Sequence, residues 1–382
     1  MAPNQDEVRT PMSTSSIENT EFYDEAAFHL DVTPPDTDSK KELDIPLDKN
    51  GRPMVKFIRW YISRRKRHCI VIGLILLFII IGLLIFYFAI VPVIVQHYMD
   101  KVVFTINYMD ITEIPNDSEI DVIFSVNLQY DVPVSATTDE MMASLIYNGV
   151  VFGTAGIGRQ NVKSGKQDYN LTMNSTMLIS DMDTFNAMAE AMMQDKTVPI
   201  TASAEIDAHA MGLSFNNIHF ESTLSVVGFN NFKEVDMEVQ QIDLWGCSDG
   251  VYQLDVNVSL NNPSNVGMQG IGALNMSLYY SNSYLGYAYS TETELGVPRS
   301  QSNQSFRMIV SATSPALLGV ITGYLSGGGI KVEVRGDNPY STEHPQFKEA
   351  MNKVNMTVEY DGGLDKITFN PLCVTSYLTM GY

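Results

Sequence analysis

The chain has 382 residues, with 24 Lys and Arg against 44 Asp and Glu, and a formal net charge of −20 at pH 7. Most of the excess acid follows residue 68, where 13 basic and 32 acidic residues remain. Nucleic-acid binding requires clustered positive charge, so this balance excludes nucleic acid as a partner of the acidic part.

Residues 1–55 are predicted to form a disordered cytosolic tail. Their apolar residues are scattered among prolines and polar residues with no sustained period of 3.6 or 2.0. Such a segment cannot bury enough apolar surface to offset the entropy of ordering it. A tyrosine-based sorting signal is incomplete here, because Tyr23 is followed three positions later by the small Ala26. A basic juxtamembrane segment, residues 56–68, comes next.

Residues 69–95 form one run without a charge, CIVIGLILLFIIIGLLIFYFAIVPVIV. About 20 apolar residues in a helix cross the roughly 30 Å hydrocarbon layer of a bilayer, and a helix satisfies its own backbone hydrogen bonds there. The run therefore predicts a transmembrane helix. Length and the absence of charge argue against the alternative of an interfacial or buried core helix.

The flanks of this run predict its orientation. The basic cluster Arg64, Arg65, Lys66 and Arg67 precedes it, whereas the matching stretch beyond it holds only Lys101. By the positive-inside rule the N-terminus is cytosolic and residues 96–382 are lumenal or extracellular. A full-length span after 68 residues is typical of an uncleaved signal anchor rather than a secretory signal peptide, so we expect a type II single-pass protein.

The part beyond the span reads as β-structure that occurs twice. Strand-like segments, some of them with an apolar residue at every second position, recur at intervals of about 130 residues. The paired segments are 120–128 with 252–260, 201–206 with 331–336, and 218–226 with 354–360. An internal duplication is the simplest explanation, and it predicts two tandem β-sandwich domains, residues 100–232 and 233–375.

Each of these domains contains one helical candidate. In residues 178–195, Leu178, Met182, Phe185, Ala189 and Met192 share one helical face, and residues 314–327 occupy the matching place in the second domain. The fold class predicted from the sequence is therefore mostly β, with one N-terminal transmembrane helix followed by two β-sandwiches with one helix each.

Residues 254–270 read LDVNVSLNNPSNVGMQG, an alternating strand that runs into Asn-Pro and a glycine-containing turn. This motif resembles the signature of late-embryogenesis-abundant type 2 domains. With the basic cluster and a span that ends in FAIVPVIVQ, residues 60–375 resemble a fungal family of single-pass vacuolar or endomembrane proteins of largely unknown function. The first domain departs from the motif, because LQYDVPVS stands at 128–135 in place of Asn-Asn-Pro-Ser.

The resemblance implies seven-stranded, fibronectin-like sandwiches without catalytic machinery. It also implies a vacuolar membrane as the preferred location, with the endoplasmic reticulum and plasma membrane as alternatives. Lipid or another apolar ligand is considered a binding partner for some members of the family. Topology and compartment are carried over from this resemblance, and no mechanism is.

N-glycosylation sequons test this topology. All seven lie beyond the span, and the candidate acceptors are Asn116, Asn170, Asn174, Asn257, Asn275, Asn303 and Asn355. Three of them, at 257, 275 and 355, stand between apolar residues of an alternating strand. Their side chains are therefore expected to point outward, where a glycan fits.

Three cysteines have different surroundings. Cys69 lies at the cytosolic edge of the span, where it is either a palmitoylation site or an ordinary apolar residue. Cys247 and Cys373 precede and follow the strands of the second domain in an oxidising compartment, which favours a disulfide that clamps this domain. The sequence does not supply the distance between them, so two free thiols stay possible.

Enzyme motifs are absent from the sequence. The four histidines beyond the span, His97, His209, His219 and His344, lack metal-ligand spacing, and no nucleophile elbow, phosphate loop or dinucleotide fingerprint occurs. We therefore expect no enzyme activity, no cofactor and no metal.

Two functions remain open. In the first, which we favour slightly, the protein is a membrane-anchored interaction or sensor protein with an unknown protein partner. In the second, one sandwich holds a lipid or another apolar molecule near the bilayer. An apolar pocket between the sheets would support the second function, and packed cores with an exposed apolar patch would support the first.

Overall fold

The computed structural model describes residues 46–47, 51, 53–57, 60–62, 64–292, 296–327 and 329–373. The tail predicted over residues 1–55 lies almost entirely outside them. Contacts divide the chain into two compact units, Met1–Phe78 and Ile79–Tyr382. In the first unit, β1 (Val55–Phe57) and β2 (Trp60–Ile62) form an antiparallel pair.

A long helical segment contains the charge-free run. It consists of α1 (Arg64–Ile85), the π-helix η1 (Phe86–Ile90) and α2 (Val91–Met99). Pro92 lies in the first turn of α2 and cannot donate a backbone hydrogen bond to the preceding turn, and the helix widens into η1 just before it. Among the described residues, Lys66–Met99 is the one helix long and apolar enough to cross a membrane.

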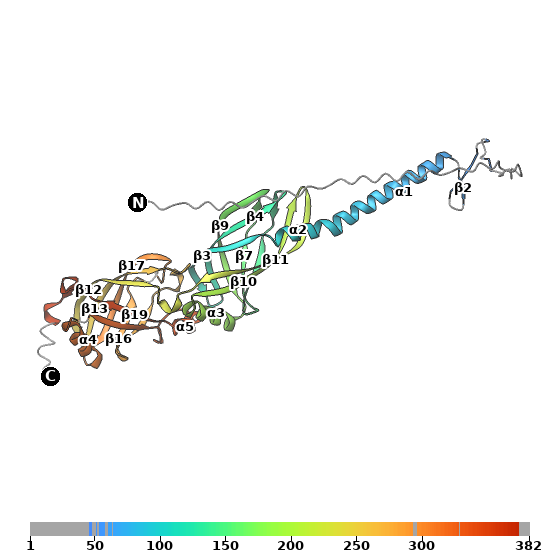
Figure 1. Cartoon of the computed structure of the whole chain (residues 1–382). Coiled ribbons are helices and arrows are strands. Elements are labelled where there is room, and N and C mark those ends of the chain that lie inside the picture. Colours follow the sequence, from blue (N-terminus) through green and yellow to red (C-terminus); the bar gives the residue numbers. More distant parts are fainter. Residues whose placement is uncertain are drawn as a thin grey trace, which may run out of the picture. The chain divides into compact units, whose positions relative to one another are not determined.

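The first large sheet has ten strands in the order β14-β3-β4-β9-β7-β6-β10-β5-β8, with β11 also paired to β10 (Figure 1). The strands are β3 (Val103–Asn116), β4 (Glu119–Val132), β5 (Ala136–Thr138), β6 (Met141–Tyr147), β7 (Val150–Ile157), β8 (Asn161–Val162), β9 (Gly165–Ile179), β10 (Thr197–Ala210), β11 (Leu213–Val227) and β14 (Val266–Met268). Helix α3 (Met182–Gln194) connects β9 to β10.

The second large sheet has eight strands in the order β19-β18-β15-β16-β17-β13-β12-β20. They are β12 (Asp236–Ser248), β13 (Val251–Asn262), β15 (Asn275–Tyr280), β16 (Ser283–Ser290), β17 (Ser300–Ser311), β18 (Ile330–Arg335), β19 (Asn355–Tyr360) and β20 (Ile367–Phe369). Its helices are α4 (Pro315–Leu325), α5 (Lys348–Met351) and the short turns η2 (Asn230–Phe232), η3 (Gln269–Ile271), η4 (Pro345–Phe347) and η5 (Leu364–Lys366).

The two sheets repeat one topology. The order β3-β4-β9-β7-β6-β10-β11 in the first matches β12-β13-β17-β16-β15-β18-β19 in the second, and α3 and α4 occupy the same place in the two halves. This is the arrangement that a duplication predicts. The mostly β, sandwich-like fold is confirmed. One strand crosses between the halves, because β14 comes from the second half of the chain and pairs in parallel with β3.

The alternating segments become strands with the predicted burial. Residues 120–128 fall within β4, where Ile120, Val122 and Val126 are buried. Residues 252–260 fall within β13, where Val256, Val258 and Leu260 are buried. The period of two therefore identified the inward face of each strand.

One hydrophobic cluster joins the two halves of the chain. It contains Ile120 and Phe185 from the first half and Met268 and Phe347 from the second. The rings of Phe185 and Phe347 meet edge to face at 5.4 Å between centroids. The two sheets therefore share one hydrophobic core and are not independently packed domains.

An ion pair closes the edge of this shared core. Arg299 Nε and Nη2 donate to the two carboxylate oxygens of Asp110 at 3.1 and 3.2 Å, and its guanidinium lies 3.8 Å from the centroid of the Tyr108 ring. The side chain of Asp110 is only 12% exposed. A two-pronged pair with one nearly buried partner holds β3 against the second half more firmly than a surface pair would.

Replacing Asp110 with Ala should lower the free energy of unfolding by about 2 kcal/mol, because Arg299 loses both charge-assisted hydrogen bonds in a poorly solvated place. Denaturant unfolding of the detergent-solubilised chain measures this. Lys331→Met is the matched control, since it breaks the exposed pair with Glu359 and should change stability by less than about 0.5 kcal/mol. Equal effects of the two substitutions would contradict a structural role for the Asp110 pair.

Candidate functional site

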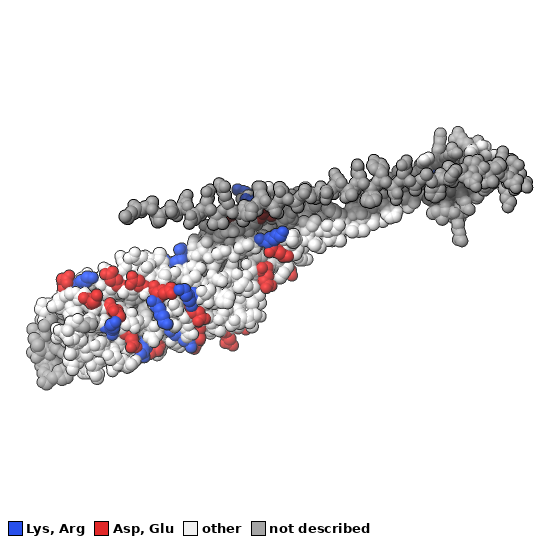
Figure 2. Space-filling model, in the orientation of Figure 1, with Lys and Arg blue, Asp and Glu red and all other residues white. Residues whose placement is uncertain are grey.

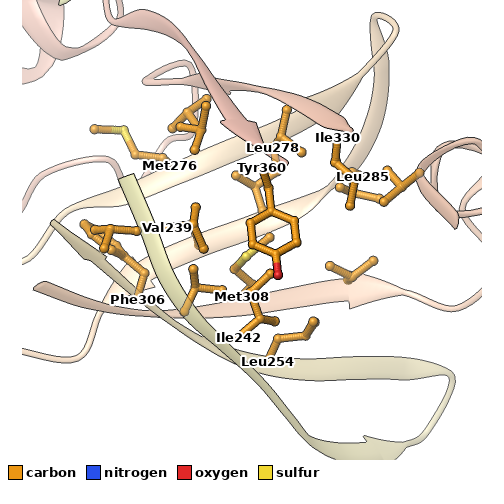
Figure 3. Close-up of a pocket in the computed structure, with 18 of the residues that line it drawn as sticks. Val239, Ile242, Leu254, Met276, Leu278, Leu285, Phe306, Met308, Ile330 and Tyr360 are labelled. Carbon is orange, nitrogen blue, oxygen red and sulfur yellow. The ribbon is translucent and has the colours of Figure 1, made fainter. Parts of the chain in front are cut away.

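The second half of the chain contains a partly open apolar cavity of about 510 Å³. The corresponding space in the first half, bounded by the first sheet and α3, measures about 50 Å³. Figure 3 shows side chains from several strands turned toward the space in the second half; those labelled are Val239, Ile242, Leu254, Met276, Leu278, Leu285, Phe306, Met308, Ile330 and Tyr360. A volume of this size lies in the range of small-molecule sites.

Strand alternation produces the lining of this cavity. On β13, Leu254, Val256, Val258 and Leu260 all face the space, while the residues between them face outward. The outward Asp255 pairs with Arg307 of the neighbouring β17 at 2.8 Å, and this partner holds the pKa of the Asp255 carboxyl below its usual value. The charged side chains of Asp255 and Arg307 therefore lie on the outer face of the sheet, away from the cavity.

Two of the tyrosine hydroxyls at the cavity are bonded to backbone oxygens. Tyr360 donates to the carbonyl of Gly363 at 2.8 Å, and Tyr324 donates to the carbonyl of Gly362 at 3.2 Å. Burial raises the pKa of the Tyr360 hydroxyl, so it stays neutral. No charged side chain is among the described residues that line the cavity, and its chemistry suits hydrocarbon.

Helices α3 and α4 begin alike but differ in burial. The N-cap Asp181 accepts a hydrogen bond from Thr184 N at 2.8 Å, and the N-cap Ser314 accepts one from Ala316 N at 3.3 Å. Counted from these caps, Phe185 and Met192 of α3 correspond to Leu318 and Leu325 of α4. The first two are 1% and 4% exposed, and the second two are 53% and 77% exposed.

The difference follows from what covers each helix. Segment η4, with Phe347, packs on α3, whereas no described residue plays that part for Leu318. Helix α4 instead lies close against Tyr280, because a Cβ on Gly319 or Gly323 would come within 2.8 or 2.7 Å of that ring and hydroxyl. The helix covers the cavity without filling it.

A C-terminal segment, residues 364–373, forms another part of the wall. Its strand β20 pairs in parallel with β12, and Leu364, Ile367 and Phe369 line the cavity. Cys373 forms a disulfide with Cys247 of β12, with Cα atoms 5.3 Å apart and a sequence separation of 126. Asn370 Nδ2 also donates to the backbone oxygen of Trp245 at 2.8 Å. The bridge fixes this wall segment to the sheet.

The sequons lie on the surface with one partial exception. Six of the seven candidate asparagines are exposed: Asn116, Asn170, Asn174, Asn257, Asn303 and Asn355. Asn275 is half-buried, and its side-chain oxygen accepts a hydrogen bond from Asn338 Nδ2 at 2.8 Å. The segment that follows β18 supplies this partner, and the strand pattern alone gave no sign of it.

The basic cluster and the first cysteine lie on one helix. Arg64, Arg65, Lys66 and Arg67 begin α1, and Cys69 is a free, exposed cysteine on the same helix.

The histidines beyond the span do not gather. His209 bonds Asp139 at 2.8 Å and Ser214 at 3.0 Å, while His97, His219 and His344 lie elsewhere. In the part of the chain that the structure describes, no three His, Cys, Asp or Glu side chains come together as metal ligands would.

Sequence reasoning missed the cavity. Many apolar residues of the second-half strands border open space, and their alternating pattern alone does not reveal this. A usable signal was the composition of residues 315–325, PALLGVITGYL, which is apolar on every face of a helix.

Charges on the face shown in Figure 2 are mixed over the β-rich part, with acidic and basic side chains next to one another. This face does not present a broad surface of one sign. Electrostatic attraction of a highly charged partner is therefore not the property that distinguishes this face.

This chain is only weakly similar to known proteins. Residues 153–278 match a family described as a protein of unknown function (DUF3712). No curated protein matches the sequence significantly. Among solved structures, red sea bream transglutaminase shares 11% identity over 71% of this chain and 31% of its own, with a TM-score of 0.25. The periplasmic chaperone SfaE shares 10% identity over 68% of this chain and 98% of its own, with a TM-score of 0.17.

The two halves should respond differently to added bulk at one equivalent position. Ala155 of β7 and Ala288 of β16 each follow a strand glycine by two residues and line their respective interiors. Ala155→Phe should destabilise the chain by about 1–3 kcal/mol, because the first core is full. Ala288→Phe should cost little, because the ring enters the cavity. Denaturant unfolding measures both, and equal losses would show that the cavity is not open space.

Proposed function

We propose that this is a membrane-anchored, non-enzymatic protein whose second sandwich holds the hydrocarbon part of a lipid or a similar apolar molecule. The apolar cavity of about 510 Å³ carries the proposal. Without a ligand, the apolar side chains that line this space do not pack against one another, and a bound hydrocarbon would supply the missing apolar contacts.

The lining limits the ligand to an apolar group. A carboxylate or phosphate inside the space would lose its hydration without gaining a charged partner, because no charged side chain is among the described residues that line it. An acyl chain or a sterol-like body fits these conditions. A polar head would remain at the surface.

The anchoring part of the proposal rests on the helix Lys66–Met99. With the basic cluster on the cytosolic side, both sheets would lie in a lumen or outside the cell, as a type II signal anchor requires. The disulfide between Cys247 and Cys373 suits such an oxidising compartment. We place the protein in the vacuolar membrane by resemblance, with glycans on several of the exposed sequons.

Photo-crosslinking tests the ligand. The full chain is reconstituted in vesicles that contain a phospholipid with a photoreactive group on its acyl chain, and the modified peptides are mapped by mass spectrometry. Adducts are expected on cavity residues such as Met308 and Tyr360, and also on the membrane helix, which serves as an internal control. Ala288→Phe should remove the cavity adducts and leave the helix adducts.

Val150→Phe adds the same ring at an exposed position of the first sheet and should change neither set of adducts. Adducts confined to the helix of the unmodified chain would refute lipid binding in the cavity.

A second function, contact with a protein partner, is favoured by the outer face of α4. Leu318 and Leu325 are exposed, whereas the equivalent residues of α3 are buried, and Leu325 also borders the cavity. An apolar helix face of this kind is a common docking surface. A partner that packs on α4 as η4 packs on α3 would bury both leucines.

A photoreactive amino acid at position 318 tests this in cells. We expect one discrete crosslinked product that Leu325→Asp removes, because a charge would have to be desolvated in the contact. The same amino acid at Met142, an exposed position of the first sheet, is the control. Identical products from both positions, or none from position 318, would speak against a partner on α4.

A further inference from the structure

The turn between β10 and β11 differs in composition from the other turns of its kind. Four two-residue turns have positive φ at both central residues: Asn148 with Gly149, Met211 with Gly212, Asp249 with Gly250, and Ser281 with Asn282. Such turns favour Asn, Asp and Gly, because a side chain with a bulky Cβ substituent is strained there. Three of the four follow this preference or use Ser, and the fourth places Met211 at φ 54°.

The strained methionine is also exposed. Met211 is 81% exposed and Leu213 is 38% exposed, so two apolar side chains stand at the tip of the hairpin. This turn is unfavourable for two reasons, the strain of its backbone and the exposure of apolar side chains to solvent. Positions that depart from the usual residue preferences in this way are often functional.

The chain path shows which way the tip points. β3 begins four residues after α2 ends and runs toward the second half, where Met109–Ile111 pair with β14. β11 runs in the same sense, since its last residue, Val227, bonds Asn265. The β10–β11 turn is therefore at the opposite end of the hairpin, on the side from which the helix arrives (Figure 1).

Helix α2 lies along this hairpin. Gln96 donates to the backbone oxygen of His219 at 2.7 Å and accepts from its N–H at 3.1 Å, while Val95 and Met99 pack against a cluster that includes Phe215. From His219 to Leu213 the strand extends about 20 Å, a distance that a helix alongside it covers in about 13 residues. Counted back from Gln96, the turn thus reaches the level of about Leu83, near the middle of the charge-free run.

Aromatic residues stand about one helical turn further along the helix, toward the sheets. Tyr87 and Phe88 follow about 20 apolar residues of the span, and tyrosine is enriched where the hydrocarbon layer meets the headgroups. We propose that Met211 and Leu213 insert into the lipid leaflet on the side of the β-sheets, so that the hairpin is a second membrane contact beside the helix. This inference depends on the membrane-spanning helix and not on the cavity.

Two contacts would fix the orientation of the first sheet on the bilayer. One helix alone allows the attached domain to rotate and tilt about its linker, whereas an inserted hairpin beside it restrains both motions. A methionine suits the position, because its flexible apolar side chain adapts to the disordered acyl boundary.

Depth-dependent quenching tests the contact in the full chain. In a Cys69→Ser background, Cys247 and Cys373 are bridged, so an environment-sensitive dye can be attached to Leu213→Cys alone. The protein is reconstituted in phosphatidylcholine vesicles that carry a spin-label quencher either near the headgroup or deep in the acyl chain. We expect a blue-shifted emission and stronger quenching by the shallow label.

Asp117→Cys, in the β3–β4 turn at the other end of the sheet, is the control position and should show neither effect. Met211→Asn should abolish the quenching at position 213 while thermal stability stays equal or rises, because Asn is the residue that this turn prefers. Met211→Gly, which also relieves the turn, should behave in the same way.

Three results would overturn the proposal. The first is an absence of quenching at position 213 while Met211 is present. The second is unchanged quenching after Met211→Asn, since the hairpin would then be near the lipid without the methionine anchoring it. The third is a dye protected from aqueous iodide but quenched by neither lipid label, which would mean that another copy of the chain covers the turn.

Discussion

The packing of α3 beneath the second half of the chain is the interaction on which the rest of the structure depends. Phe185 is 1% exposed because Phe347 and its neighbours close over it. This contact merges two sheets of equal topology into one core and fills the first interior. The second half has the same strand order, but among the described residues no further repeat packs on α4 as the second half packs on α3. Its interior consequently keeps a volume that the first lacks.

The sequence predicted the strands well because strand burial follows a period of two that is visible residue by residue, as in Ile120 and Val122 of β4. It also predicted the duplication, because both copies keep that pattern at one spacing. The cavity could not be predicted in this way. Leu254 and Val258 have the sequence pattern of core residues whether the space that they face is filled or empty. The alternation of apolar and polar residues shows which side chains face inward, but it does not show how completely they fill the interior. The pairing of β14 with β3 was equally hidden, since three residues carry no pattern.

Asymmetry between the halves also appears in the surface details. In the first half, α3 buries most of its apolar side chains, whereas the hairpin tip exposes Met211 and Leu213. In the second half, the β12–β13 turn uses Asp249 and Gly250, but α4 exposes two leucines. At these equivalent places the two halves therefore expose different apolar residues. A duplication followed by divergence explains this, since the half joined to the membrane helix and the terminal half face different surroundings.

The cysteines and the basic cluster each give an argument about which way the helix is oriented in the membrane, and the two arguments have different physical causes. Charge beside the span acts through the potential and the machinery that inserts the helix, whereas a disulfide depends on the redox state of the compartment. Cys69, next to Arg67, is free, and Cys247 and Cys373 beyond the span are bridged. The proposed orientation, with a reducing cytosol on the side of Arg67 and an oxidising lumen on the side of the sheets, is consistent with both observations. The reverse orientation would leave a closed bridge in a reducing compartment and the positive cluster on the side that the positive-inside rule disfavours. In the proposed orientation, the wall segment that the bridge secures at Cys373 lies on the oxidising side.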